Sequence, residues 1–159
     1  AVAQYAKSSE KVTGTEDGSI FNAELSTSIE GLSLAAGYIK TDKNGGVGSI
    51  SGLGDNVSPF EDGNYAYGGE DALTNQTKNE KTYYATLGYS IAGVDLGLVY
   101  GKTKYDTTTT TGDTEKELDL SVGYSFSDEL SASLVYVDVN AESAADDYSK
   151  IVASLTYAF

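Results

Sequence analysis

The sequence contains no cysteine, histidine or arginine, and its single proline is Pro59. Without Cys and His, the chain lacks the thiolate and imidazole groups that most often serve as nucleophiles, general bases and metal ligands. Its paired carboxylates, Glu70-Asp71 and Asp146-Asp147, are adjacent in sequence, a pattern more typical of solvated loops than of a glycosidase pair. We therefore expect that the protein is not an enzyme and that it uses no cofactor.

Long apolar runs are also absent. No segment approaches the roughly 20 consecutive apolar residues that a membrane-spanning helix needs, so no helical span is predicted. No charged and then apolar leader precedes Ala1, and we expect the chain to be a mature product or a fragment.

Positive charge is scarce. The chain has 24 acidic residues and 10 basic ones, all lysine, for a net charge of −14. An acidic surface argues against nucleic acid as a partner, because phosphates require a basic surface. Two interpretations of the charge stay open, namely attraction of cations and simple solubility.

Short alternating runs bounded by turn residues extend along the whole sequence, and this pattern predicts antiparallel strands. We expect eight strands, at residues 1–8, 19–30, 32–42, 81–91, 94–106, 115–126, 130–140 and 148–159. Their connections alternate between tight turns, at 29–32, 91–94 and 126–130, and longer polar segments, at 9–18, 43–80, 107–114 and 141–147. This asymmetry is typical of transmembrane β-barrels of the outer-membrane type, whose periplasmic turns are short and whose extracellular loops are long.

The two-residue period of a strand assigns alternate side chains to opposite faces of the sheet. One face is apolar and nearly free of charge, for example at Leu87, Leu98 and Leu120, and would contact lipid. The other is small and polar and would face the lumen. Its charged members are predicted to be Glu24, Asp95, Glu117, Asp119 and Lys150.

The segment 130–140 fits this pattern less well, because Val135, Val137 and Val139 alternate with Leu134 and Tyr136. The sequence leaves open a bulge or an apolar patch on the lumen wall. A soluble β-sandwich with the same apolar positions in its core is the alternative architecture.

Tyrosines mark both ends of the predicted strands. Tyr5, Tyr38, Tyr100 and Tyr136 each precede a charged residue by two positions near the long connections, and Tyr89, Tyr124 and Tyr157 lie near the short turns. A tyrosine buries its ring while its hydroxyl reaches water, which suits a membrane interface. The pattern predicts two aromatic girdles.

The last residues close the repeated hairpin series. Leu155, Tyr157 and Phe159 alternate on the apolar face, and this ending resembles the final strand of outer-membrane barrels. The resemblance implies that these three residues act as an assembly signal for the barrel insertion machinery.

Further motifs carry a family resemblance. The repeats Tyr89-Ser90-Ile91 and Tyr124-Ser125-Phe126, the run 118–124, the ending 150–159 and the loop motif 58–64 resemble the C-terminal part of the major outer membrane porins of Campylobacter and its relatives. The resemblance implies a homotrimeric porin in the outer membrane of a Gram-negative bacterium, in contact with the lipid bilayer and lipopolysaccharide. Porins of that family are about two and a half times longer than this chain.

Two architectures are open: a complete eight-stranded barrel, or eight strands of a wider one. An eight-stranded barrel is filled by its own inward side chains. The four predicted lumen carboxylates would have Lys150 as their only inward cation, and burying unpaired carboxylates is costly. This argument favours the wider, water-filled barrel.

The segment 43–80 is the candidate for a functional loop, because connections of this length are usually functional or disordered. Phe60, Tyr65 and Tyr67 could anchor it. If it folds inward, it would form a channel constriction that favours cations and could hold Ca²⁺ or Mg²⁺. If it stays outside, it would be a recognition surface. The candidate constriction residues are Asp55, Glu61, Asp62, Glu70 and Asp71.

The sequence therefore predicts a passive, cation-preferring channel for small hydrophilic solutes. The alternative is a non-conducting eight-stranded outer-membrane anchor or adhesin that acts through its extracellular loops.

Overall fold

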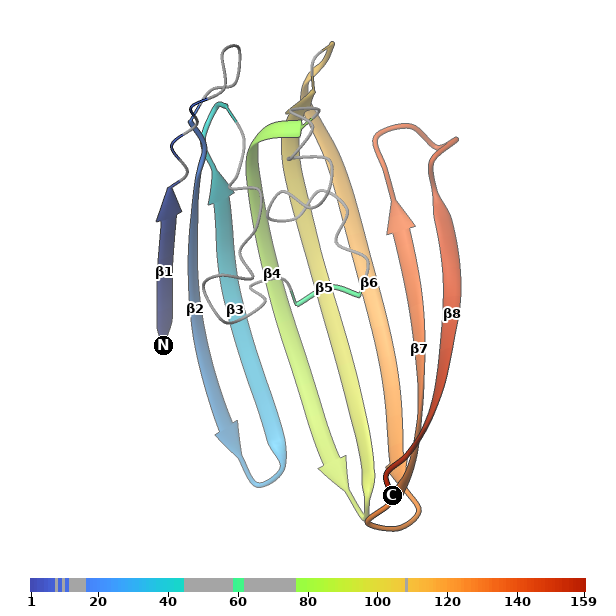
Figure 1. Ribbon diagram of the computed structural model, residues 1–159. Coiled ribbons are helices and arrows are strands. Elements are labelled where there is room, and N and C mark those ends of the chain that lie inside the picture. The colour runs from blue at the N-terminus through green and yellow to red at the C-terminus, as the bar shows by residue number, and fades with distance from the viewer. Residues whose placement is uncertain (8, 10, 12–16, 45–58, 62–76, 108) are drawn as a thin grey trace.

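Eight β-strands form one antiparallel sheet in the computed structural model, which describes residues 1–7, 9, 11, 17–44, 59–61, 77–107 and 109–159 (Figure 1). The strands are β1 (Val2–Lys7), β2 (Ser19–Ile29), β3 (Leu32–Thr41), β4 (Thr77–Ile91), β5 (Val94–Thr107), β6 (Thr111–Ser125), β7 (Leu130–Asn140) and β8 (Tyr148–Tyr157). Each strand pairs with its neighbours in sequence. The predicted all-β class and the eight antiparallel strands are confirmed.

The sheet is not closed. Its order runs from β1 to β8, and in the described residues these two strands form its edges and do not pair with each other (Figure 1). A complete eight-stranded barrel would need that pairing. The described residues include no helix of a length and hydrophobicity that would cross a membrane.

Three tight turns lie at one end of the sheet, the lower end in Figure 1. In two of them both central residues have positive φ: Glu30 (47°) with Gly31 (83°), and Ala92 (51°) with Gly93 (81°). Positive φ at both positions is what two-residue type I′ hairpins require, because their twist matches that of the flanking strands. In the third turn, the Ser127 hydroxyl accepts hydrogen bonds from the backbone N–H groups of Glu129 and Leu130.

Two strands begin earlier than the sequence predicts. β4 starts at Thr77 rather than 81, so the last four residues of the predicted loop 43–80 are strand. β6 starts at Thr111 rather than 115, so the connection predicted at 107–114 shortens to 108–110. Asp106 explains both extensions, since it accepts hydrogen bonds from the Asn79 side chain (2.9 Å) and the Gly112 backbone N–H (2.8 Å). The polar composition of these segments concealed their pairing.

The two faces of the sheet differ in covering. We call the face against which Phe60 packs the inner face, and the opposite one the outer face. The buried strand residues occur at alternate positions of β2 to β7 and belong to the inner face, among them Ile39, Thr82, Val137 and Val139. Large apolar residues of the outer face are exposed, for example Leu25 (70%) and Leu155 (73%).

β7 pairs with β6 and β8 without a register shift, so it contains no bulge. Val137 lies opposite Asp119, and Val139 lies opposite Glu117, on the inner face. Both valines are fully buried. Of the two possibilities left open by the sequence, the apolar patch on the inner wall is therefore the one observed.

Candidate functional site

The predicted lumen carboxylates belong to rows that cross the inner face from strand to strand. Residues opposite one another in register share a face. In one such row, the residues from β2 to β6 are Glu24, Gly37, Tyr84, Gly101 and Glu117. The neighbouring row, toward the tight turns, places Val99 opposite Asp119, and the next pairs in it join Asp119 to Val137 and Val137 to Lys150.

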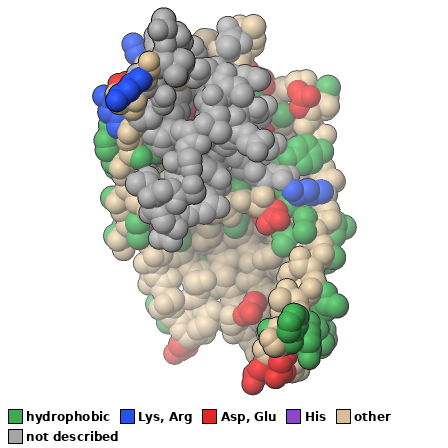
Figure 2. Space-filling model, in the orientation of Figure 1, with side chains coloured by type: hydrophobic (Ala, Val, Ile, Leu, Met, Phe, Trp, Pro, Cys, Tyr) green, Lys and Arg blue, Asp and Glu red, His purple; other side chains and the backbone are tan. Residues whose placement is uncertain are grey.

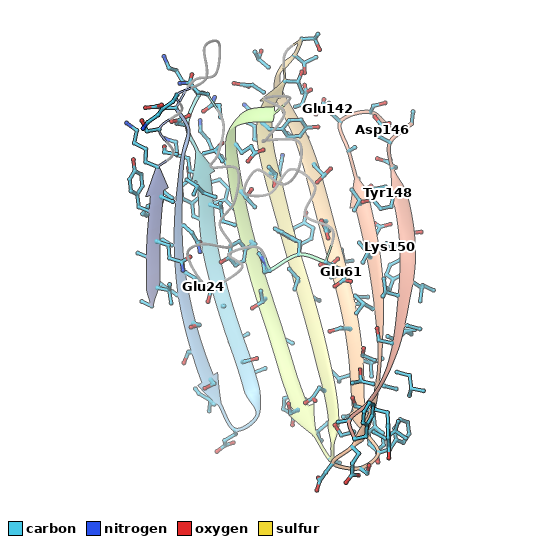
Figure 3. All side chains as sticks on the ribbon, viewed as in Figure 1. Glu24, Glu61, Glu142, Asp146, Tyr148 and Lys150 are labelled. Carbon is cyan, nitrogen blue, oxygen red and sulfur yellow. The ribbon has the colours of Figure 1, made fainter. Side chains whose placement is uncertain are left out.

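Tyr84 extends across β3 within the first row. Its hydroxyl donates a 2.9 Å hydrogen bond to the Glu24 carboxylate, two strands away. Gly37 stands between them, and a Cβ atom there would overlap the Tyr84 ring. The absence of a side chain at Gly37 thus leaves room for Tyr84 to reach Glu24, whose side chain is labelled in Figure 3.

A second glycine, Gly101, leaves the space in which the Phe60 ring packs. A Cβ atom at Gly101 would overlap the Phe60 ring, which instead packs against that backbone. The ring also meets Tyr84 edge-on, with centroids 6.1 Å apart and an interplanar angle of 75°. Ile20 and Ile39 complete the apolar cluster against which Phe60 lies. Such edge-to-face geometry is a favourable aromatic contact.

The next residue continues this attachment. The backbone N–H of Glu61 donates a 2.9 Å hydrogen bond to Asp119 on β6. Residues 59–61, the green segment in front of the sheet in Figure 1, are thus fixed on the inner face by an aromatic contact with β4 and β5 and by a polar contact with β6. Phe60, one of the predicted anchors, occupies this position.

The five predicted lumen-facing residues share the inner face but differ in accessibility. Glu117 and Asp119 are buried, at 4% and 5% exposed. Glu24 and Lys150 are partly exposed, and Asp95 is exposed near the tight turns, where it accepts a hydrogen bond from Ser90. Glu117 and Asp119 are thus covered, whereas Glu24, Asp95 and Lys150 stay accessible on the same face.

The inner face is otherwise small and polar toward the tight turns. Ser33 lies opposite Gly88, Gly97 lies opposite Ser121, and Gly123 lies opposite Ser133. Figure 2 looks onto this face, and its lower part is mostly tan, with hydrophobic side chains gathered toward the margins.

Most candidate constriction residues fall outside the part of the chain that the structure describes. Of the five, Glu61 is described and is exposed, and its side chain is labelled in Figure 3. Asp55, Asp62, Glu70 and Asp71 lie outside the described residues, as do the predicted anchors Tyr65 and Tyr67.

The outer face carries the predicted aromatic rows. Tyr38 and Tyr83 lie opposite each other near the longer connections, with ring centroids 4.8 Å apart. Near the tight turns, Tyr124 contacts Phe126 edge-on at 4.9 Å. The proposed assembly residues also lie there: Tyr157 stacks with Phe159 at 6.5 Å, and Leu155 is 73% exposed.

The space that Gly37 and Gly101 leave for aromatic rings was not identified from the sequence. A signal was present, because Gly37 and Gly101 are the register neighbours of the one bulky aromatic residue, Tyr84, in the predicted polar row. A glycine opposite an aromatic residue on the neighbouring strand leaves room for the aromatic ring to lie over its backbone. The contact with Phe60 could not be read locally, since it joins segments that are distant in sequence.

Among the described residues, no group of three or more Asp, Glu, His or Cys side chains is arranged so that it could hold a metal ion. The predicted Ca²⁺ or Mg²⁺ site therefore stays a prediction about residues 55–71, most of which are not described. The geometry instead defines a polar, acidic sheet surface backed by an apolar one.

A scan against models of protein families finds no match to this chain, and no curated protein matches it.

Proposed function

We propose that this chain forms part of the wall of an outer-membrane β-barrel. Small hydrophilic solutes would diffuse passively through this barrel, with cations preferred. The outer face would contact lipid, and the inner face would line a water-filled lumen. Homotrimeric assembly is part of the proposal on the resemblance to porins alone.

The proposal rests on the distribution of polarity over the sheet, which is the reverse of that in a soluble protein. The outer face is apolar, and the covered inner face is polar. Leu34, Leu87, Leu98 and Leu120 form one cross-strand row on the outer face, and their side chains are 36–43% exposed. A soluble protein rarely leaves a contiguous apolar surface of this extent uncovered. A barrel in a membrane needs such a surface, with polar residues inside.

The open sheet supports a barrel wider than eight strands. Among the described residues, no further strand pairs with the outer side of β1 or of β8, and an open sheet edge inside a bilayer would be costly. Further strands that continue the ladder on both sides would remove these edges. The accessible carboxylates Glu24 and Asp95 support a cation preference, because carboxylates along a pore attract cations.

Planar-bilayer recording tests the proposal. The full-length protein, with the further strands that close the barrel, should produce discrete conductance steps, and a salt gradient should give a reversal potential of the sign expected for cation selectivity. The variant Glu24→Gln/Asp95→Asn should show a weaker preference. Asp146→Asn/Asp147→Asn, which removes the same charge in the β7–β8 connection, is the matched control and should differ little from wild type.

Two outcomes would contradict the proposal. An absence of conductance steps from protein that is folded in the bilayer would favour a non-conducting anchor. Clear anion selectivity would oppose the role assigned to the carboxylates.

A further inference from the structure

Tyrosine is the most readily oxidised side chain that this chain contains. The sequence has 13 tyrosines and no cysteine, methionine, tryptophan or histidine, the side chains that otherwise take up oxidising equivalents in proteins. Oxidation of the protein surface therefore falls on tyrosine. Two oxidised tyrosines form a stable product when their rings lie together, so the arrangement of the rings determines the outcome.

One pair of tyrosine rings lies together on the outer face. Tyr38 of β3 is directly opposite Tyr83 of β4, their ring centroids are 4.8 Å apart, and the ring planes are inclined by 36°. Tyr83 is 63% exposed and Tyr38 is partly exposed, so a small oxidant can reach the pair. Of the ring contacts between described residues, this one alone joins two tyrosines.

Two other exposed tyrosines contact rings that cannot take part in such a coupling. Tyr124 packs against Phe126 and Tyr157 against Phe159, and phenylalanine has no phenol to oxidise.

Tyr100 is the nearest competitor for Tyr83. Ala85 lies opposite Tyr100, so Tyr100 is a diagonal neighbour of Tyr83 across the β4–β5 pair. Diagonal neighbours are about 7–8 Å apart, whereas the Cβ atoms of directly opposed residues are about 4.5–5.5 Å apart. The register therefore favours coupling of Tyr83 with Tyr38.

We infer that Tyr38 and Tyr83 are a modification site, at which a one-electron oxidant derived from hydrogen peroxide joins β3 to β4 through a dityrosine bond. Each phenol loses one electron and one proton and becomes a phenoxyl radical, whose unpaired electron is shared with the ring carbons beside the hydroxyl-bearing carbon. A carbon–carbon bond forms between one such carbon of each ring. The hydrogen on each bonded carbon then leaves as a proton while the oxygen of that ring takes one up, so both phenols are restored. The two electrons and two protons removed at the start reduce one hydrogen peroxide to two water molecules.

The coupling requires side-chain rotation and no change of register. The χ2 torsion of tyrosine has a broad distribution, and exposed side chains reorient within picoseconds to nanoseconds. The bond would close the chain between residues 38 and 83, a span that contains the longest connection between strands, 42–76. In a chain without cysteine, it would act as a disulfide does, by restricting the unfolded state. The inference does not rest on the proposed pore.

Peptide mapping of the oxidised protein tests the inference. The full-length protein, folded in non-ionic detergent, is treated with a haem peroxidase and hydrogen peroxide, digested with trypsin and analysed by tandem mass spectrometry. Cleavage after lysine releases residues 12–40, in which Tyr38 is the only tyrosine, and residues 82–102, which contain Tyr83. The expected product has the summed mass of these two peptides less two hydrogen atoms. Tyr38→Phe and Tyr83→Phe each remove one phenol of the pair, and Tyr100→Phe is the matched control.

The linked peptides should form from wild type and from Tyr100→Phe in yields within about twofold of each other, because the opposed pair is intact in both. Tyr38→Phe and Tyr83→Phe should each lower the yield at least about tenfold, since no second phenol lies directly opposite the one that remains. In urea, wild type should lose its preference for this pair. The inference is overturned if folded wild type gives no such product, if either pair variant keeps the wild-type yield, if Tyr83 couples to Tyr100 instead, or if bonds form only between separate molecules.

The bond should also raise thermal stability. On semi-denaturing gels, oxidised wild-type protein should keep its folded form to a temperature at least about 5 °C above that of untreated protein. Oxidised Tyr83→Phe should not differ from untreated Tyr83→Phe. An equal rise in both proteins would contradict the role of the bond, because oxidation at another position would then be the cause.

Discussion

At the scale of single residues, Gly101 determines whether Phe60 can lie against the sheet. Substitution Gly101→Ala places a Cβ atom where the Phe60 ring packs, so it should lower the free energy of unfolding by about 1–3 kcal/mol. Gly123→Ala is the matched control, because a Cβ atom there meets nothing closer than 3.8 Å. It should be neutral or should stabilise by up to about 1 kcal/mol. Urea unfolding of the refolded protein measures both.

Removal of the ring should reduce the cost at Gly101. In the Phe60→Ala background, Gly101→Ala should destabilise less than in wild type, by a coupling energy above about 0.5 kcal/mol. If the two substitutions change the free energy of unfolding in a strictly additive way, the Phe60 ring does not pack against Gly101.

The Tyr84 hydroxyl is the second residue whose role can be isolated. Tyr84→Phe keeps the ring over Gly37 but removes the hydrogen bond to Glu24, so it should lower the free energy of unfolding by about 1 kcal/mol. Tyr5→Phe is the control, since Tyr5 is 64% exposed on the outer face. It should change the same quantity by less than about 0.5 kcal/mol. An equal, small effect of both substitutions would contradict the assigned bond.

At the scale of elements, β8 carries the proposed assembly signal. Deletion of Phe159 removes the ring that stacks on Tyr157 and should reduce the amount of heat-modifiable, folded protein recovered in the membrane. Phe126→Ala removes another exposed ring, next to a different tight turn, and should have a smaller effect. Semi-denaturing gel electrophoresis of membrane fractions gives the measurement. Unchanged insertion after the deletion would refute the signal.

The elements also show what a two-residue period can and cannot predict. The period located all eight strands and assigned Glu24, Glu117 and Asp119 to one face, because alternation is a local property of the chain. It missed the first four residues of β4 and of β6, since their pairing depends on Asp106 and on its bonds to Asn79 and Gly112. It also missed the burial of Glu117 and Asp119. It could not locate the contact between Phe60 and Gly101, because this contact joins segments that are far apart in sequence.

At the scale of the whole molecule, the account depends on which face of the sheet meets water. The chain contains no cysteine, so a single introduced cysteine reports on one position only. Suitable inner-face positions are Thr86, Ser121 and Ser133, and suitable outer-face positions are Leu87, Leu98 and Leu120.

The most direct measurement is the rate at which each cysteine variant, folded into phosphatidylcholine vesicles, reacts with a charged, membrane-impermeant maleimide. The account predicts that Thr86→Cys, Ser121→Cys and Ser133→Cys react readily. It predicts that Leu87→Cys, Leu98→Cys and Leu120→Cys react only after unfolding in urea, because lipid covers them. If the three leucine-position variants react in the folded protein as fast as in urea, the outer face is in water, and the sheet is not the wall of a membrane pore.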